Sequence, residues 1–219
     1  MADPKSFFLG AEIHDYLVAH GSPPDTIAQA LVADTAALGG ISMMQVAPEQ
    51  GAFLTLLTRV LGVRFAVEVG TFTGYSALCI ARGLAPGGRL LCCDVSEEWT
   101  AVGRPHWEAA GVADRIELRI APAVETLRGL PVEPSIDLAF IDADKPSYAV
   151  YYEEVLARLV PRGVILVDNV LWGGSVVNPE ANDENTAAIR AFNDKIAADE
   201  RVDAVMLPIS DGLTFIVRR

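Results

Sequence analysis

The sequence predicts an α/β fold in which a mostly parallel sheet carries helices on both faces. Three observations lead to this prediction. From about residue 62, short apolar runs rich in β-branched residues alternate with amphipathic helical patterns, and only a short turn separates the last two runs. The first 60 residues carry helical patterns alone. With 219 residues, 51% of them apolar, we expect one domain at 1–219, made of a helical N-terminal extension (1–61) and a core (62–219).

The extension is expected to hold three helices, at 5–20, 25–38 and 49–61. The segment HGSPP separates the first helix from the second, because glycine and proline interrupt helices.

The core is expected to begin with five parallel strands. The apolar runs lie at 65–70, 89–94, 115–121, 136–143 and 163–169. The helical patterns lie at 75–85, 97–111, 123–130, 148–160 and 183–200. This alternation is typical of parallel strands joined by helical crossovers.

The end of the chain follows a different pattern. Two apolar runs, 202–209 and 213–219, are joined by the turn Ser-Asp-Gly. A short turn containing glycine joins antiparallel strands, so the last strand should run against the others. The sheet should therefore have seven strands.

The composition limits the partners and the compartment. The net charge is −12, which argues against nucleic acid and anionic membrane surfaces as partners. The amino terminus lacks the apolar core of a signal peptide, and no apolar run approaches the ~20 residues of a membrane helix. The cysteines Cys79, Cys92 and Cys93 lie in apolar segments, which is typical of reduced core thiols in a cytoplasmic protein; a reactive Cys92–Cys93 pair is the less favoured interpretation.

Acidic residues gather where the predicted parallel strands end. They are Glu68, Asp94, Asp142, Asp144 and Asp168. Open parallel sheets bind ligands beyond the carboxyl ends of their strands, so these acids indicate a site at that edge.

The turn after the first strand favours a ligand that contains adenosine. Gly70 and Gly74 would let the backbone approach a ligand closely, and Asp94 ends the second strand 20 residues after Gly74. An acid in this place can accept hydrogen bonds from a ribose diol. The alternative is that Asp94 caps the helix that starts near Ser96.

The charge of these strand ends selects among adenosine ligands. NAD and ATP carry phosphates, which bind basic residues and helix amides, yet Lys145 is the only nearby cation. The glycine spacing also differs from the G-x-G-x-x-G of dinucleotide enzymes. S-adenosylmethionine, with a sulfonium, an ammonium and no phosphate, fits such a pocket.

Five motifs together resemble a known enzyme family. VEVGTFTGYSAL, CCDVSEEW, FIDADKPSYAVYY, VDNVLWGGSV and ISDGLTFIVRR are similar to segments of the metal-dependent, S-adenosylmethionine-dependent O-methyltransferases of the catechol and caffeoyl-CoA type, in a compact bacterial form. The resemblance runs from about residue 40 to the end. It implies the class I methyltransferase Rossmann-like fold, S-adenosylhomocysteine as a product, and a homodimer.

The resemblance also implies roles for individual residues. The cofactor would contact Met44, Val46, Glu68, Gly70, Thr71, Tyr75, Ser76, Asp94, Ala123, Asp142 and Asp144. The metal ligands would be Asp142, Asp168 and Asn169, the proposed base would be Lys145, and the acceptor would lie near Tyr151 and Trp172. Plant members carry Asn where Gly173 stands, and the loop before the fourth strand is short here, which weakens an inference to a CoA thioester acceptor.

The chemistry of the implied ligands favours a hard cation. Two carboxylates and one amide oxygen suit Mg²⁺, with Ca²⁺ or Mn²⁺ as alternatives. The alternative role of Asp142 and Asp168 is a salt bridge to Lys145 or a helix cap. His14, His20 and His106 lie outside these motifs and are expected to be surface or interface residues.

The predicted reaction is methyl transfer to one hydroxyl of a small aromatic vicinal diol, such as caffeic acid, a caffeoyl derivative or a flavonoid. The metal would chelate both hydroxyls and lower a pKa, and Lys145 would take or hold the proton. The alternative for Lys145 is a surface lysine that screens the acids, and for Trp172 it is core packing. Rival functions are a nicotinamide-dependent oxidoreductase, a catalytically silent S-adenosylmethionine-binding protein and, less favoured, a metal hydrolase.

Overall fold

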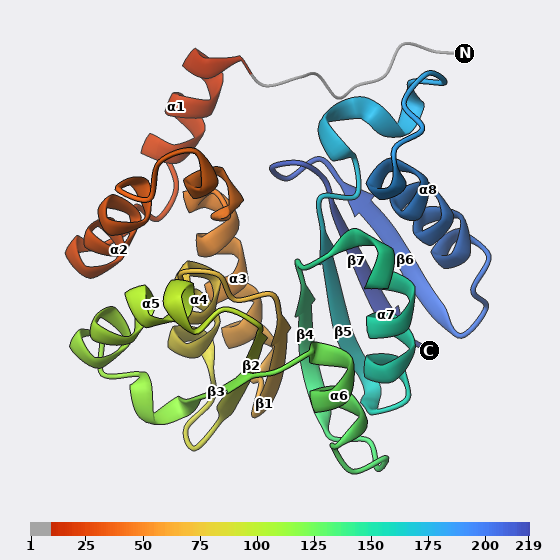
Figure 1. The fold of residues 1–219 in the computed structure, drawn as a ribbon. Helices are drawn as coiled ribbons and strands as arrows, with labels where there is room; N and C mark the ends of the chain where they lie inside the picture. Colours follow the sequence, from red (N-terminus) through yellow and green to blue (C-terminus); the bar gives the residue numbers. More distant parts are fainter. Residues whose placement is uncertain (1–9) are drawn as a thin grey trace.

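The sheet has the seven strands and the final antiparallel strand that the sequence predicts. The structure is a computed structural model that describes residues 10–219 (Figure 1). The strands are β1 (Phe65–Val69), β2 (Arg89–Asp94), β3 (Ile116–Ile120), β4 (Ile136–Ile141), β5 (Leu159–Asp168), β6 (Val202–Leu207) and β7 (Leu213–Arg218). Their order across the sheet is β3-β2-β1-β4-β5-β7-β6, and only β7 runs against its neighbours.

Helices cover both faces of this sheet, as expected. The α-helices are α1 (Ala11–Ala19), α2 (Thr26–Ala36), α3 (Pro48–Leu61), α4 (Tyr75–Gly83), α5 (Glu97–Ala109), α6 (Ala123–Arg128), α7 (Tyr148–Leu156) and α8 (Glu184–Ala197). Short 3₁₀ segments are η1 (Gly39–Met44), η2 (Ala113–Arg115), η3 (Lys145–Ser147) and η4 (Trp172–Val177). Residues of α2 to α5 share one buried cluster, and residues of α6 to α8 share the other, on opposite sides of the sheet (Figure 1). None of the described helices is both long and apolar enough to span a membrane.

The apolar side chains of β1 divide between the two faces. Ala66 packs in the cluster of α2 to α5, whereas Val67 packs in the cluster of α6 to α8. Neighbours in a strand point to opposite faces, so a strand with helices on both sides buries every residue. The same alternation separates Cys92 from Cys93, and the described structure pairs neither in a disulfide.

The prediction of one helix over 148–160 was wrong at its C-terminal end. Helix α7 ends at Leu156, and Leu159 already pairs with Ile136 as the first residue of β5. Pro161 cannot continue a helix, and the carbonyl of Arg158 accepts hydrogen bonds from the strand before it. The first helix was predicted at 5–20; α1 begins at Ala11, and residues 5–9 lie outside the described residues.

The N-terminal helices pack closely against the core. Gly51 of α3 lies against α4 so closely that a Cβ there would stand 2.6 Å from the Tyr75 ring. Thr35 of α2 donates a buried hydrogen bond of 2.8 Å to the Thr73 hydroxyl in the turn after β1. These contacts place the predicted extension directly beside the carboxyl edge of the sheet.

Candidate active site

One pocket of about 970 Å³ lies at the carboxyl edge of the parallel strands. The predicted site residues that line it are Met44, Val46, Gly70, Thr71, Tyr75, Ser76, Asp94, Ala123, Asp142, Asp144, Lys145, Tyr151, Asp168, Asn169 and Trp172. Of the residues predicted for the site, only Glu68 is absent from this lining. The structure thus brings the predicted residues together, while the ligand that each one binds stays a prediction.

The turn between β1 and α4 needs glycine. Gly70 and Gly74 have φ of +87° and +80°, a region that side chains with a Cβ disfavour. A Cβ on Gly70 would overlap the backbone oxygen of Asp142, and one on Gly74 would overlap the Trp107 ring. The turn therefore passes directly against the end of β4, which positions its amides at the pocket.

Asp94 holds this turn. One of its carboxylate oxygens accepts hydrogen bonds from the backbone N–H groups of Thr71 (2.9 Å) and Phe72 (2.8 Å), and the other accepts from Ser96 (2.8 Å). The cap of α5 is Ser96 itself, whose hydroxyl accepts from the Trp99 N–H. The alternative prediction that Asp94 itself caps α5 is therefore wrong, because Ser96 is the capping residue. A carboxylate has about four acceptor sites, so one stays available to a ligand.

Two aromatic side chains beside Asp94 were not predicted. Phe72 and Trp99 line the pocket and meet edge to face, with ring centroids 5.5 Å apart. The sequence signal that could have identified Trp99 is its position in the first turn of α5, the helix that follows β2. A flat ligand ring entering beside Asp94 would pack against these side chains.

Glu68 is the penultimate residue of β1, as the prediction of a strand-end acid requires, but its side chain does not line the pocket. It lies inside β1, is fully buried, and has no hydrogen-bond partner for either carboxyl oxygen among the described residues. Burial raises its pKa to about 8, and the nearby hydroxyls of Ser76 and Thr71 offset this only in part. The hydroxyl of Thr71 is also buried without a partner. The Glu68 carboxyl lies outside the pocket lining, so its contact with the cofactor stays a prediction.

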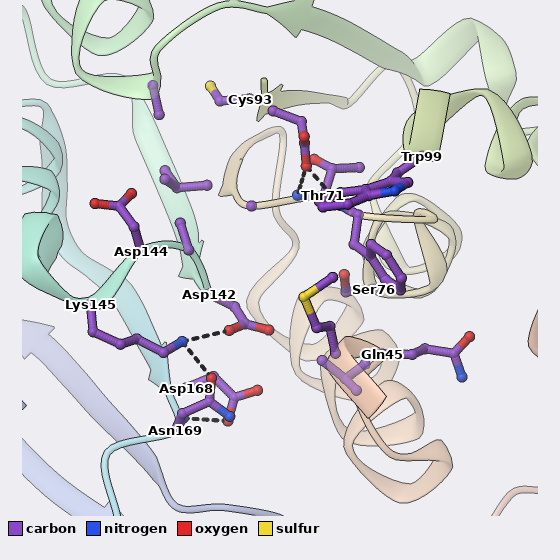
Figure 2. A pocket seen from close by; sticks show the side chains of 18 of the residues that line it. Gln45, Thr71, Ser76, Cys93, Trp99, Asp142, Asp144, Lys145, Asp168 and Asn169 are labelled. Atoms are coloured by element: carbon purple, nitrogen blue, oxygen red, sulfur yellow. Dashed lines mark hydrogen bonds and ion pairs between the residues drawn. The ribbon is translucent and has the colours of Figure 1, made fainter. Parts of the chain in front are cut away.

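Asp142 and Asn169 come together at Lys145 (Figure 2). The Lys145 ammonium donates to Asp142 Oδ1 at 3.1 Å and to Asn169 Oδ1 at 2.6 Å. Asn169 reaches this point because β5 ends at Asp168 and Asn169 turns into the left-handed region, with φ of +58°. The alternative salt bridge between Asp142 and Lys145 therefore exists. Lys145 is buried, so the alternative prediction that it is a surface lysine was wrong. Tyr148 orients the ammonium, since its hydroxyl lies 2.6 Å from Nζ and donates to the Asp168 carbonyl.

Asp168 is held by a residue that the sequence analysis missed. The fully buried Gln50 of α3 donates from Nε2 to Asp168 Oδ2 at 2.7 Å, and the Asn169 N–H donates to Oδ1 at 2.7 Å. No local signal could have identified Gln50, because it lies 118 residues before its partner.

These oxygens suit a divalent cation. Burial raises the pKa of both Asp142 and Asp168, and the charge of Asp142 raises the pKa of Asp168 further. The described residues hold no group of three His, Cys, Asp or Glu side chains that could bind a metal; the predicted set has two carboxylates and an amide. That all-oxygen set matches Mg²⁺ chemically, and one ammonium does not balance the charge of two carboxylates, one partly exposed and one buried.

The other end of the pocket is formed by Tyr151, Trp172 and the turn before β7. Tyr151 donates its hydroxyl to Asp144 Oδ1 at 2.6 Å. Trp172 is half-buried, its ring centroid is 5.5 Å from Lys145 Nζ, and it lines the pocket, so the interpretation of Trp172 as a core residue was wrong. The predictions did not include the other lining residues on this side, Asn185, Ser210 and Asp211.

Backbone strain gathers at this pocket. Five described residues other than glycine have positive φ, and Phe72, Asn169, Trp172 and Ser210 line the pocket; the fifth is Arg162. Such residues cluster at functional sites, where the surrounding structure holds them.

The histidines lie elsewhere. His106 pairs with Asp34 at 2.8 Å and His14 with Glu49 at 3.2 Å, and no histidine lines the pocket. His20 is exposed and His14 and His106 are partly buried, and an interface role for them stays a prediction.

Comparison with known proteins gives consistent results. The sequence pattern of one family, described as O-methyltransferase, matches residues 19–219. The chain is 40% identical over 210 residues to a probable caffeoyl-CoA O-methyltransferase of Dictyostelium discoideum, covering 94% of this chain and 91% of that one. A crystal structure of an O-methyltransferase from Bacillus cereus in complex with SAH has a TM-score of 0.86 and 34% identity, covering 95% of this chain and 97% of that one. The O-methyltransferase TomG from Streptomyces achromogenes, solved with SAM, has a TM-score of 0.86 and 28% identity, with coverages of 94% and 96%.

Proposed function

The chain belongs to the O-methyltransferase family, and we propose that it moves a methyl group from S-adenosylmethionine to one hydroxyl of an aromatic vicinal diol, with a divalent cation bound. One observation supports both the diol acceptor and the divalent cation. Asp142, Asn169 and Lys145 converge on one point at the pocket wall, with oxygen-to-nitrogen distances of 3.1 and 2.6 Å.

The methyl donor is supported by the pocket and by the relatives. The relatives from Bacillus cereus and Streptomyces achromogenes were solved with SAH and SAM. In support of this donor, Asp94 lines the pocket and keeps one acceptor site for a ribose hydroxyl, and Phe72 and Trp99 offer apolar surface for a base. The scarcity of basic side chains in the described lining argues against a pyrophosphate, and thus against NAD.

The cation would be held by Asp142, Asp168 and Asn169, with Mg²⁺ favoured and Ca²⁺ or Mn²⁺ as alternatives. When bound, it would lower the pKa of an acceptor hydroxyl and orient the diol. Gln50 would keep Asp168 in place, because it fixes one carboxylate oxygen and leaves lone pairs free.

Lys145 would accept the proton of the acceptor hydroxyl as a neutral amine, or hold the acceptor oxygen in place as an ammonium. Its ammonium is buried and fixed by Tyr148, Asp142 and Asn169, so it is positioned rather than mobile. Trp172 would flank the acceptor ring, because it lines the pocket and its ring centroid lies 5.5 Å from Lys145 Nζ.

The test compares acceptors that differ in one hydroxyl. Initial rates are measured with caffeic acid and its monohydroxy analogue, at saturating S-adenosylmethionine, with Mg²⁺ or with excess chelator. The monohydroxy compound should have kcat/KM lower by at least about 100-fold, since it loses chelation and orientation together. Lys145→Ala should lower the rate of diol methylation less than excess chelator does. Equal rates on both compounds would contradict chelation of the acceptor by the cation. Full activity in excess chelator would contradict the requirement for a divalent cation. A protein that binds S-adenosylmethionine but methylates nothing would match the silent binding protein.

We further propose that the protein works as a cytoplasmic homodimer. Its support is apolar surface on the N-terminal helices and three cysteines that form no disulfide in the described structure. The exposed apolar side chains of α1 and α3 are Ile13, Tyr16, Leu17, Leu56, Val60 and Leu61. Light scattering of the purified protein and of Val60→Lys checks the dimer, because a charge on a buried interface disfavours pairing; a monomeric wild type contradicts it. Microscopy of a fluorescent fusion checks the compartment.

A further inference from the structure

We propose that Arg190 is a positioning residue for the acceptor: it ties the loop that carries Trp172 to α8, and so keeps one wall of the pocket in place before the acceptor binds. The inference rests on the proposed function, because it concerns the acceptor side of that same pocket. Arg190 is not among the residues that line the pocket, so it can act on the acceptor only through the loop.

The loop at 171–182, between β5 and α8, has no buried side chain to hold it. All of its residues are exposed or partly exposed. Its first turn is also strained, because Trp172, Gly173 and Gly174 follow one another with φ of +48°, +58° and +84°. The left-handed region disfavours a residue with a Cβ, so Trp172 stays there only if the surrounding structure holds it. Hydrogen bonds to the loop backbone must therefore supply most of that restraint.

The guanidinium of Arg190 makes four of these hydrogen bonds. Nε donates to the carbonyl of Val176 at 2.9 Å, Nη1 to that of Ala181 at 2.8 Å, and Nη2 to those of Ser175 at 2.9 Å and Asn178. A guanidinium holds its five N–H donors in a rigid, planar fork, so the four carbonyls are fixed relative to one another as well as to α8. One side chain thus determines the course of the loop after its first turn.

The first turn of the loop is tied to the turn before β7. The N–H of Gly173 donates to Asp211 Oδ1 at 2.6 Å, and the N–H of Leu171 donates to the Asp211 carbonyl at 3.0 Å. Trp172 lies between these two donors, so its backbone is restrained on both sides. Asp211 and Arg190 together hold the loop at its two ends, and Trp172 is the loop residue that lines the pocket.

Arg190 also links two residues of the pocket wall. Asn185 lies in the first turn of α8 and lines the pocket, and Arg190 belongs to the same helix. By joining the loop to α8, Arg190 fixes Trp172 relative to Asn185. A wall that is already ordered lowers the entropy that acceptor binding must overcome. A loop that is ordered only part of the time weakens binding in proportion to the fraction that is competent.

A purely structural role for Arg190 makes a different prediction, and Arg218 provides the control. Arg218 of β7 donates to the carbonyls of Leu156 and Leu159, where β5 begins, at the edge of the sheet opposite the pocket. Arg218→Met therefore removes a backbone-bound guanidinium and one positive charge, as Arg190→Met does, but away from the acceptor.

The experiment compares the loop, the acceptor and the methyl donor in one set of variants. The set is the wild type, Arg190→Met, Arg190→Lys, Arg218→Met, Trp172→Ala, and Trp172→Ala combined with Arg190→Met. Hydrogen exchange followed by mass spectrometry measures the order of the loop at 171–182. Calorimetry measures the affinity for S-adenosylmethionine, and that for caffeic acid with S-adenosylhomocysteine and Mg²⁺ present. Initial rates give kcat and KM for caffeic acid.

We expect Arg190→Met to speed hydrogen exchange of the loop by about 10-fold or more, with the sheet unchanged, because the freed carbonyls can bond to water. The affinity for caffeic acid should fall by about 5- to 30-fold, mostly as a higher KM, while that for S-adenosylmethionine changes by less than about 2-fold. Arg190→Lys should resemble Arg190→Met, because one ammonium keeps the charge but cannot span four carbonyls. In the Trp172→Ala background, Arg190→Met should cost less than about 2-fold in acceptor affinity. Arg218→Met should leave the loop and the acceptor affinity unchanged.

Three results would overturn the inference. Loop exchange that is unchanged in Arg190→Met would show that Arg190 does not hold the loop. Faster exchange with unchanged acceptor affinity would show that the loop does not position the acceptor. Equal losses of affinity for caffeic acid and S-adenosylmethionine, or an undiminished loss in the Trp172→Ala background, would reduce Arg190 to a structural role. If Arg190→Met does not fold, Arg190→Lys supports the same comparisons.

Failure of the proposed function gives a distinct result. In that case the wild type binds S-adenosylmethionine but neither binds nor methylates caffeic acid, whatever residue stands at position 190. The exchange measurement still tests the link between Arg190 and the loop, because it needs no acceptor.

Discussion

Replacing Glu68 with glutamine is expected to flatten the dependence of stability on pH. The folded protein buries this carboxyl completely and raises its pKa from 4.5 to about 8. Below pH 4.5 the group is protonated in both the folded and the unfolded states, and it does not affect their balance. Between pH 4.5 and 8 the unfolded chain ionises and the folded chain does not, so stability falls as pH rises. Above pH 8 the carboxyl is ionised in both states, so the loss of stability no longer changes with pH.

The size of this effect follows from the shift in pKa. One proton bound by the folded state alone changes the free energy of unfolding by about 1.4 kcal/mol per pH unit. From pH 5 to pH 8 the wild type should therefore lose roughly 4 kcal/mol through Glu68. Glutamine cannot ionise, and it has nearly the same size, so Glu68→Gln removes the loss without leaving a cavity.

Urea denaturation of the ligand-free protein, followed by circular dichroism at pH 5, 6, 7 and 8, measures the effect. Other buried acids also titrate, so the informative quantity is the difference in free energy of unfolding between Glu68→Gln and the wild type. That difference should shift in favour of the variant by roughly 4 kcal/mol over this range. Glu117→Gln, on the exposed surface of β3, is the matched control and should show no such trend. A difference that stays constant with pH would refute the argument.

Three further predictions concern the two ends of the pocket. Gln50→Leu should lower the free energy of unfolding by about 2–3 kcal/mol, because Asp168 loses a buried donor; urea denaturation of the metal-free protein checks this, and an unchanged value contradicts it. Asp94→Ala should weaken S-adenosylmethionine binding by about ten- to a hundred-fold in calorimetry, whereas an unchanged dissociation constant in a folded variant would limit Asp94 to holding the turn. Asp168→Ala should abolish both diol methylation and the thermal stabilisation by Mg²⁺ while leaving S-adenosylmethionine binding largely intact; retained stabilisation by Mg²⁺ speaks against the metal set.

The parts of the fold that the sequence predicts are those set by local patterns. Apolar runs and glycine turns identify the strands, and the short turn at 210–212 identifies the antiparallel end. The strand ends therefore placed Asp94, Asp142 and Asp168 at one edge. The boundary at Leu159 was missed because apolar residues continue from α7 into β5, and periodicity alone does not separate a short helix end from a strand start.

The parts that could not be predicted depend on contacts between distant segments. The burial of Glu68 outside the pocket lining follows from packing around the end of β1, which the strand pattern alone does not give. Gln50 looks like any polar residue in the first turn of a helix until α3 is placed over β5. Asp211 belongs to a turn whose residues are typical of any hairpin, and only the packing of the loop at Gly173 brings it to the pocket.

The bond between Gln50 and Asp168 has a consequence for the order in which the chain is made. The two residues are 118 positions apart, so α3 leaves the ribosome long before its partner exists. At 5–20 residues per second, the interval is roughly 6 to 24 s. During that time the amide of Gln50 must wait for β5, the strand that ends at Asp168. Helix α3 can pack against α4 early, but the contact that orients Asp168 is completed only after β5 has been translated.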